Sequence, residues 1–242
     1  MDAIATAPQR PRVLGVGVNL GDVRAQALEL HRHGGGQIVT LNAEMTMAAR
    51  ADRRLGEAIE AADLVIPDGA GVVWALGRQG HRVRRSPGIE TARWLLEHGA
   101  EVGWSVALIG ASPEVMDLLR RRLARELPGL RLVFSAHGYQ QDADWPRLER
   151  EILELGPDLV LVALGVPRQE LWIRSLAGRR HGLWMGVGGS FDVWAGTKKR
   201  APDWMSALQV EWLYRLLKEP TRWRRMLALP AFAWAVLRER QG

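Results

Sequence analysis

The sequence predicts an α/β fold with a mostly parallel sheet, helices on both of its faces, and a helical C-terminal appendage. Two patterns indicate this. Up to Gly196, short apolar runs alternate with segments whose apolar residues recur at helical spacing. After Gly196 the apolar runs typical of strands stop. Strands separated by helices favour a parallel sheet with right-handed crossovers, and such sheets bind ligands at the carboxyl ends of their strands.

The individual elements follow from these patterns. Predicted strands are Arg12–Val18, Gln37–Leu41, Leu64–Pro67, Ser105–Ile109, Leu130–Ser135, Asp158–Leu164 and Leu183–Val187. Amphipathic helices are predicted between them, most plainly at Glu114–Glu126 and Trp145–Leu155. Beyond Gly196 we expect helices broken at prolines, which lack a backbone donor, namely Pro202, Pro220 and Pro230. A boundary near residue 196 then separates a core, residues 1–196, from a basic, tryptophan-rich appendage, residues 197–242.

The net positive charge lies in that appendage. The chain of 242 residues carries a formal charge of +6, and from Lys198 onward there are ten Lys or Arg against four Asp or Glu. The core is therefore neutral. The absence of cysteine fits a reducing compartment. The N-terminus lacks the pattern of a signal peptide, and no apolar run is long enough to predict a membrane-spanning helix. We therefore expect a cytoplasmic location.

Three predicted strands end in glycine loops that lead into a helix. These are "LIGASPE" with Gly110, "ALGVPRQE" with Gly165 and "GVGGSFDVWAG" with Gly189. Glycine lets the backbone approach a ligand, and the free N–H groups of a helix start favour phosphate. An ordinary turn is the alternative for each loop. The dinucleotide fingerprint is absent, because "GVGVNLG" has its third glycine one position late, and "AGTKK" lacks the first glycine of a P-loop.

Polar residues follow two other strands. "VTLNAEM" contains Thr40 and Asn42, and "VIPDGAG" contains Asp68. A carboxylate just past a buried strand and before a glycine turn is placed for general base catalysis, while the alternative is that it caps the next helix. The "DAD" of Asp142 and Asp144 is interpreted as a helix cap rather than a metal site. No HExxH motif or histidine cluster predicts zinc.

In their order and spacing these segments resemble the WecG/TagA/CpsF family of bacterial glycosyltransferases, glycosyltransferase family 26. The resemblance extends over about residues 37–226 and depends most on "GVPRQE", "GGSFDVWAG" and "EWLYRLLKEPTRWRR". It implies a Rossmann-like fold and an inverting hexosyl transfer from a UDP-sugar to a polyprenyl-diphosphate-linked sugar. The transferred sugar is N-acetylmannosamine, its uronic acid or glucose, in teichoic acid, cell-wall or surface polysaccharide synthesis. The family implies no metal and no cofactor.

The resemblance also implies roles for residues. Asp68 matches the catalytic base, with Thr40 and Asn42 in the same pocket. Tyr139 is expected against the uracil ring, and the other nucleotide-side positions are Gly110, Gly165, Gln169, Gly189 and Asp192. Three arginines of the appendage are expected to reach the diphosphate, where a planar, permanent cation suits phosphate oxygens: Arg215, Arg222 and Arg225. Arg85 and Gly88 match the acceptor side. Glu90 stands where the family usually has Asp, and it is assigned no role.

The end of the chain indicates contact with a membrane surface. Met226–Leu237 is free of charge, too short to span a bilayer but suited to its interface, and Trp223 and Trp234 suit the headgroup region. We expect peripheral attachment at the inner face of the plasma membrane; a core-packed terminal helix is the alternative. Two other functions remain open, a nicotinamide-dependent oxidoreductase and a non-catalytic module that binds membrane or nucleic acid. For the favoured function no nucleic acid partner is expected. Whether the chain forms a homo-oligomer is left open.

Overall fold

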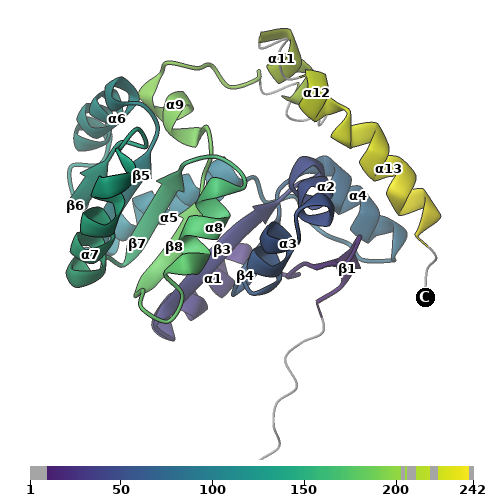
Figure 1. Ribbon diagram of the computed structural model, residues 1–242, viewed down its shortest axis with the longest axis horizontal. Helices are drawn as coiled ribbons and strands as arrows, with labels where there is room; N and C mark the ends of the chain where they lie inside the picture. The colour runs from purple at the N-terminus through teal and green to yellow at the C-terminus, as the bar shows by residue number, and fades with distance from the viewer. Residues whose placement is uncertain (1–9, 203–204, 206–210, 219–222, 240–242) are drawn as a thin grey trace, which may run out of the picture.

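The computed structural model describes residues 10–202, 205, 211–218 and 223–239. Its main feature is a six-stranded parallel sheet in the order β4-β3-β8-β7-β5-β6 (Figure 1). The strands are β3 (Gly35–Leu41), β4 (Leu64–Pro67), β5 (Ser105–Gly110), β6 (Arg131–Ala136), β7 (Leu159–Ala163) and β8 (Gly182–Gly186). The α/β, Rossmann-like fold predicted from the sequence is confirmed, and these six strands match predicted ones to within two residues at either end.

The last strand in sequence lies in the middle of the sheet. β8 pairs with β3 on one side and with β7 on the other. Where it begins, Gly182 pairs with Gly35. Gly35 has a φ of +91°, and a Cβ there would overlap the carbonyl group of Gly182. Glycine at position 35 therefore lets the two backbones approach closely at the start of the central pair.

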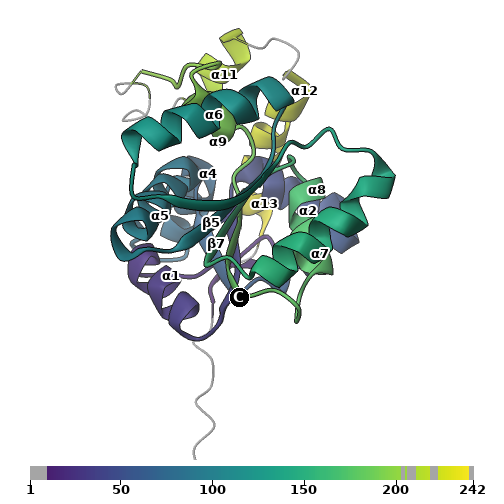
Figure 2. The ribbon, with the colours of Figure 1, turned by 90° about the vertical axis from the view of Figure 1, so that its left-hand side faces the viewer.

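Helices cover both faces of the sheet (Figure 2). On one face lie α1 (Val23–Arg32), α5 (Gly88–Val102), α6 (Pro113–Glu126) and α9 (Ser190–Ala195). On the other lie α2 (Ala43–Ala51), α3 (Arg53–Glu60), α4 (Ala70–Arg78), α7 (Trp145–Leu155) and α8 (Arg168–Ser175). Side chains alternate along each strand, so that Ile38 packs against the first set and Val39 against the second. Both faces of the inner strands are therefore buried, as in parallel sheets generally, while the edge strand β6 is partly exposed.

The first predicted strand is not a strand of this sheet. Residues 12–17 instead form a small antiparallel hairpin, β1 (Arg12–Val13) and β2 (Val16–Gly17). Leu14 and Gly15 join the two strands, and both have positive φ values, +51° and +89°. The prediction of one continuous strand was wrong because Gly15 accepts a left-handed conformation that reverses the chain.

The "DAD" segment forms a short 3₁₀ helix, η1 (Asp142–Asp144), directly before α7. Asp144 occupies the N-cap position of α7, but its side chain accepts no capping hydrogen bond. Its backbone is helical, with φ −83° and ψ −26°. A capping side chain needs an extended backbone to reach the free N–H groups of the first turn. The predicted cap is therefore wrong.

The appendage contains α11 (Glu211–Lys218), α12 (Trp223–Met226) and α13 (Ala228–Arg238). α13 packs on α2 and α4, with Phe232 and Val236 in the shared apolar core. α12 ends at Met226 and α13 begins at Ala228, so the helices are interrupted three residues before Pro230. Pro230 lies in the first turn of α13, where N–H groups have no partner within the helix and proline loses no hydrogen bond. Pro202 lies outside any helix, and Pro220 lies outside the described residues. The boundary near residue 196 stays a prediction.

Among the described residues, no helix combines the length and the apolar composition that a membrane span needs.

Candidate active site

A cleft of about 1250 Å³ opens at the carboxyl ends of the strands. Its walls are the segments that follow β3, β4, β7 and β8, the segment 197–201, and side chains of α11. The structure brings together most of the residues predicted from the sequence: Thr40, Asn42, Asp68, Arg85, Gly88, Tyr139, Gly165, Gln169, Gly189 and Asp192. They come from distant parts of the chain, and adjacent parallel strands place them at one edge.

Asp68 is held at the end of β4 by two backbone contacts. Its N–H donates to the carbonyl oxygen of Leu41 at 3.0 Å, and its Oδ1 accepts a hydrogen bond from the N–H of Gly88, also at 3.0 Å. The N-cap of α4 is Gly69, which makes no side-chain capping bond. Asp68 is therefore not the helix cap that the sequence left as an alternative, and its carboxylate is directed to the start of α5.

Thr40 and Asn42 pack against the two glycines next to this carboxylate, Gly88 and Gly69. A Cβ on Gly88 would lie 2.8 Å from Cγ2 of Thr40, so the start of α5 is in close contact with β3. The Oδ1 atom of Asn42 accepts a hydrogen bond from the N–H of Met45 at 2.9 Å and caps α2. A Cβ on Gly69 would lie 2.9 Å from Cβ of Asn42. Asn42 thus fixes the turn beside Asp68 through its cap and its backbone contacts.

The opposite side of the cleft is formed by the two glycine loops after β7 and β8. Gln169 joins them, because its Oε1 accepts hydrogen bonds from the N–H groups of Gly165 and Gly188, each at 3.1 Å. Its Nε2 donates to Oε1 of Glu170 at 2.7 Å. Both side chains belong to residues that are 2% exposed. The sequence did not identify Glu170, since only the fold reveals that this carboxyl is buried.

Gly110 does not line the cleft. Its φ is +115°, and a Cβ there would overlap the carbonyl group of Ala163 on the neighbouring strand. The following helix is capped by Ser112, whose Oγ accepts from the N–H of Val115 at 3.2 Å. The "LIGASPE" loop has the geometry of an ordinary strand-to-helix turn, and its glycine permits close packing of β5 on β7.

Positively charged side chains line the cleft where the appendage begins. They are Lys198, Lys199, Arg200 and Lys218, with Arg85 contributed by the segment between α4 and α5. Lys198 Nζ lies 3.8 Å from Oδ1 of Asp192, and Arg200 Nη2 lies 2.5 Å from Oε1 of Glu90. The sequence analysis did not single out Lys198, Lys199 and Arg200, although the basic run "TKKR" could have indicated them. Glu90, which had no assigned role, ties the start of the appendage to α5.

Three further predictions concern Tyr139, the arginines of the appendage and metal binding. Tyr139 is 77% exposed and reaches the cleft from the segment after β6. Arg222 and the side chains of Arg215 and Arg225 lie outside the described residues, so the expectation for these arginines stays a prediction. Within the described part of the chain, no group of three or more His, Asp or Glu side chains is placed to hold a metal ion.

Comparison with known proteins gives consistent similarities. The model of the "Glycosyl transferase WecG/TagA/CpsF family" matches residues 12–242. A protein of Bacillus subtilis (strain 168) is 35% identical over 213 residues, which cover 86% of this chain and 81% of the relative. One of Bacillus spizizenii (strain ATCC 23059 / NRRL B-14472 / W23) is 35% identical over 218 residues, covering 88% and 83%. Both carry the name N-acetylglucosaminyldiphosphoundecaprenol N-acetyl-beta-D-mannosaminyltransferase.

Proposed function

Because this chain belongs to the WecG/TagA/CpsF family and is a glycosyltransferase, we propose that it transfers N-acetylmannosamine from UDP to a polyprenyl-diphosphate-linked N-acetylglucosamine. The names of both relatives favour this donor sugar over the uronic acid and glucose that the sequence left open. They also favour a lipid-linked acceptor. The product would serve the synthesis of a cell-wall polysaccharide such as teichoic acid. The oxidoreductase and the non-catalytic module are left without support.

The observation that carries the proposal is the position of Asp68. Its carboxylate lies in the cleft beside Thr40, fixed by the N–H of Gly88. In the proposed reaction the acceptor hydroxyl attacks the anomeric carbon, the new C–O bond forms as the bond to UDP breaks, and Asp68 takes the hydroxyl proton. Attack opposite the leaving group inverts the anomeric centre. A well-placed base contributes about 10²–10⁴-fold to the rate.

The leaving UDP gains negative charge, and cations in the cleft are positioned to stabilise it. Lys198, Lys199 and Lys218 line the cleft at the side of the appendage, and the family's arginines are expected to act with them. Fixed cations aimed at a developing charge stabilise a transition state more than a ground state. The substrates bring two diphosphates into one cleft, so this side of the protein would hold both the donor and the acceptor.

Attachment to the membrane surface would bring the enzyme to its lipid acceptor. α13 buries Phe232 and exposes Trp234 and Leu237 on its other side. Trp212, Leu217 and Trp223 are exposed large apolar side chains of α11 and α12. The terminal helix is thus packed on the core by one face while the other is available to the headgroup region. We place this surface at the inner face of the plasma membrane.

A transfer assay tests the proposal. The purified protein is given UDP-N-acetylmannosamine, its uronic acid or UDP-glucose, with a short-chain polyprenyl-diphosphate N-acetylglucosamine, with and without Mg²⁺. We expect metal-independent formation of a β-linked disaccharide from the first donor. Titration calorimetry with UDP and NAD provides a separate measure of nucleotide binding. Absence of transfer from every UDP-sugar, together with absence of UDP binding, would contradict the proposal.

A further inference from the structure

The amide of Gln169 has a fixed orientation. Its oxygen must face the cleft loops, since the N–H groups of Gly165 and Gly188 are both donors. Its nitrogen must then face an acceptor, and Oε1 of Glu170 supplies one. The whole arrangement is buried, so a reversed amide would leave donors facing donors. Glu170 therefore supplies the acceptor that this orientation of the amide requires.

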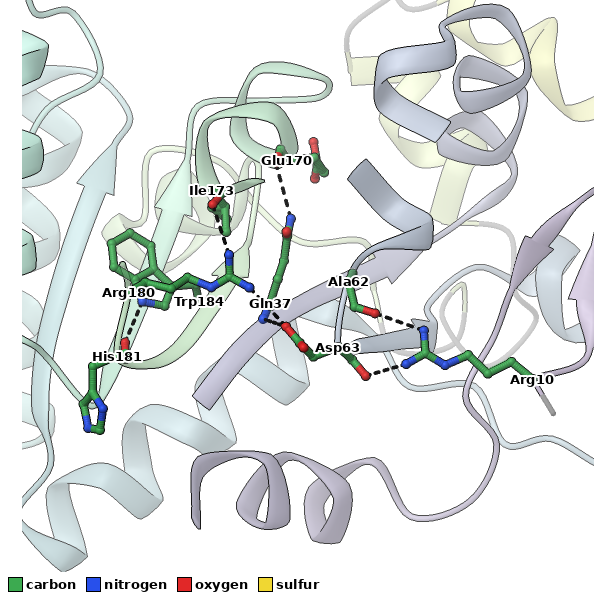
Figure 3. A network of polar contacts seen from close by, with 9 residues as sticks. All are labelled: Arg10, Gln37, Ala62, Asp63, Glu170, Ile173, Arg180, His181 and Trp184. Atoms are coloured by element: carbon green, nitrogen blue, oxygen red, sulfur yellow. Dashed lines mark hydrogen bonds and ion pairs between the residues drawn. The ribbon is translucent and has the colours of Figure 1, made fainter. Parts of the chain in front are cut away.

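The backbone is shaped around this pair of side chains. A Cβ on Gly186, at the end of β8, would overlap the amide of Gln169 and lie 3.0 Å from Oε1 of Glu170. On the other side, Gln37 reaches from β3 to α8, where its Nε2 contacts the carbonyl oxygen of Glu170 at 3.4 Å (Figure 3). The N–H of Gln37 is itself held by Oδ2 of Asp63 at 2.7 Å. The carboxyl of Glu170 thus lies where β3, β8 and α8 meet.

A buried carboxyl in such a place is unfavourable for packing alone. An apolar side chain would fill the same space without desolvating an acid, and Oε2 of Glu170 has no hydrogen-bond partner among the described residues. What an apolar side chain lacks is an acceptor for Gln169. The carboxyl is therefore explained by the hydrogen bond that it accepts from the Gln169 amide behind the two loops.

We propose that Glu170 is a positioning residue for the sugar transfer. Through the amide of Gln169 it fixes the loops that carry Gly165 and Gly188, which form the side of the cleft facing Asp68. Glu170 itself touches no substrate. This inference rests on the proposed function for its catalytic consequence, but the loop order that it describes is a property of the protein alone.

Substitutions that keep or remove the acceptor test the proposal. Glu170→Gln keeps an acceptor oxygen of the same shape, and Glu170→Leu removes it. In Glu170→Leu we expect kcat to fall at least about tenfold, because the free energy of one buried hydrogen bond corresponds to a rate factor of this size. In Glu170→Gln we expect kcat to stay within about threefold of wild type. Gln169→Leu, which removes the acceptor of both loops, should lose at least as much as Glu170→Leu. Glu154→Leu, on the exposed side of α7, is the control for loss of a glutamate.

A double substitution separates positioning from direct contact. In Gln169→Glu with Glu170→Gln, a carboxylate accepts from both glycine N–H groups and an amide at position 170 donates to it, so every hydrogen bond is kept with the roles exchanged. Because Gln169 lines the cleft, turnover of this variant would report substrate contact as well as loop order, so its readout is hydrogen exchange. Both glycine N–H groups should stay as protected as in the wild type, and protection as low as in Gln169→Leu would overturn the proposal.

Amide hydrogen exchange gives a readout that needs no substrate. In Glu170→Leu the N–H groups of Gly165 and Gly188 should exchange at least about tenfold faster than in wild type, while both remain protected in Glu170→Gln and in the double variant. Wild-type exchange in a folded Glu170→Leu would overturn the proposal, and if that variant does not fold, loss of protection in the double variant would do so. Lack of transfer by the wild-type protein would count against the proposed function alone.

Discussion

At the scale of single residues, two carboxyl groups serve the cleft in different ways. Asp68 lies in the cleft, where a substrate can exchange a proton with it, and the N–H of Gly88 holds its carboxylate in place. Glu170 lies behind the cleft wall, and burial raises its pKa to about 7, against hydrogen bonds from Gln169 and from its own backbone. The first is available to substrate, whereas the second is available only to its protein neighbours.

Replacing Asp68 separates its catalytic part from its structural part. Asp68→Asn keeps an oxygen that can accept from the N–H of Gly88, so the melting temperature should change little while kcat falls by about 10²–10⁴-fold. Asp68→Ala should lose the same activity and about 1 kcal/mol of stability as well. Single-turnover transfer and thermal unfolding of both variants measure this. A rate for Asp68→Asn within tenfold of wild type would show that another group takes the proton.

The buried carboxyl of Glu170 predicts a pH dependence of stability. Its pKa rises from an ordinary 4.5 to about 7 in the folded protein, so the folded state holds the proton more tightly than the unfolded state. The stabilisation is complete below pH 4.5 and is lost as pH rises through 7. The loss amounts to about 3 kcal/mol. Urea unfolding at pH 5, 6, 7 and 8 should show this decline in the wild type relative to Glu170→Gln, and parallel curves would refute it.

The sequence identified Asp68, Thr40 and Asn42, because polar residues directly after apolar strands are visible as a local pattern. It did not identify Asn42 as the cap of α2, although that contact is local and joins Asn42 to Met45. The support of Gln169 by Glu170 could not be predicted, because it depends on burial of this pair where α8 packs against β3 and β8. Gly110 illustrates a different limit, since a glycine that packs against Ala163 has the same sequence signature as one that meets a phosphate, and its expected role on the nucleotide side stays a prediction.

At the scale of elements, the close contact between β5 and β7 can be tested at Gly110. A methyl group there meets backbone rather than a movable side chain, and the φ of +115° disfavours any L-residue. Gly110→Ala should therefore cost at least about 2 kcal/mol. Gly77 in α4 is a matched control, because a Cβ there meets nothing within 4 Å and alanine should stabilise the helix by about 0.5–1 kcal/mol. Chemical denaturation measures both, and equal effects would contradict the packing role.

The two faces of α13 predict two separable losses. Phe232 is 2% exposed and packs beside Gly71 of α4, so Phe232→Ala should destabilise the protein by about 3–5 kcal/mol. Trp234 is 57% exposed and lies under the guanidinium of Arg238, 3.7 Å from the ring centroid. Trp234→Ala with Leu237→Ala should leave the melting temperature unchanged and weaken binding to anionic vesicles. Sedimentation with vesicles of anionic and neutral lipid measures this, and unchanged binding would remove α13 from the membrane surface.

Helices and strands were predicted correctly where the apolar periodicity was long. The prediction failed where the backbone conformation of a single residue determined the structure. α7 begins and ends where the sequence places it, since its apolar side chains recur over three turns. The hairpin of residues 12–17 and the missing cap at Asp144 depended on one local backbone conformation each. Apolar periodicity does not report such local choices.

At the scale of the whole molecule, the cleft and the proposed membrane surface share the same helices. Tyr214 and Lys218 of α11 line the cleft, while Leu217 of the same helix is exposed. Ala228, where α13 begins, also lines the cleft. A lipid acceptor lying in the membrane would then present its diphosphate directly to the cationic side of the cleft.

Removal of the appendage is therefore a test with two effects. Truncation before residue 205 should abolish vesicle binding, and it should also expose the apolar side chains of α2 and α4 that α13 covers. We expect the truncated protein to self-associate, measurable by light scattering, so substitutions at Trp234 and Leu237 are the cleaner test of membrane contact. A monomeric, vesicle-binding truncated protein would contradict both expectations.

The order of strands was beyond sequence-based prediction, and it has a consequence for synthesis on the ribosome. β8 joins β3 to β7, so a nascent chain that ends before Gly182 can pair β3 with β4 and β5 with its neighbours but cannot unite the two groups. Neither group alone brings Asp68 opposite the loops of Gly165 and Gly188. We therefore expect no activity from a growing polypeptide. The active site can form only after β8 and the loop of Gly188, which belong to the final quarter of the chain, have left the exit tunnel.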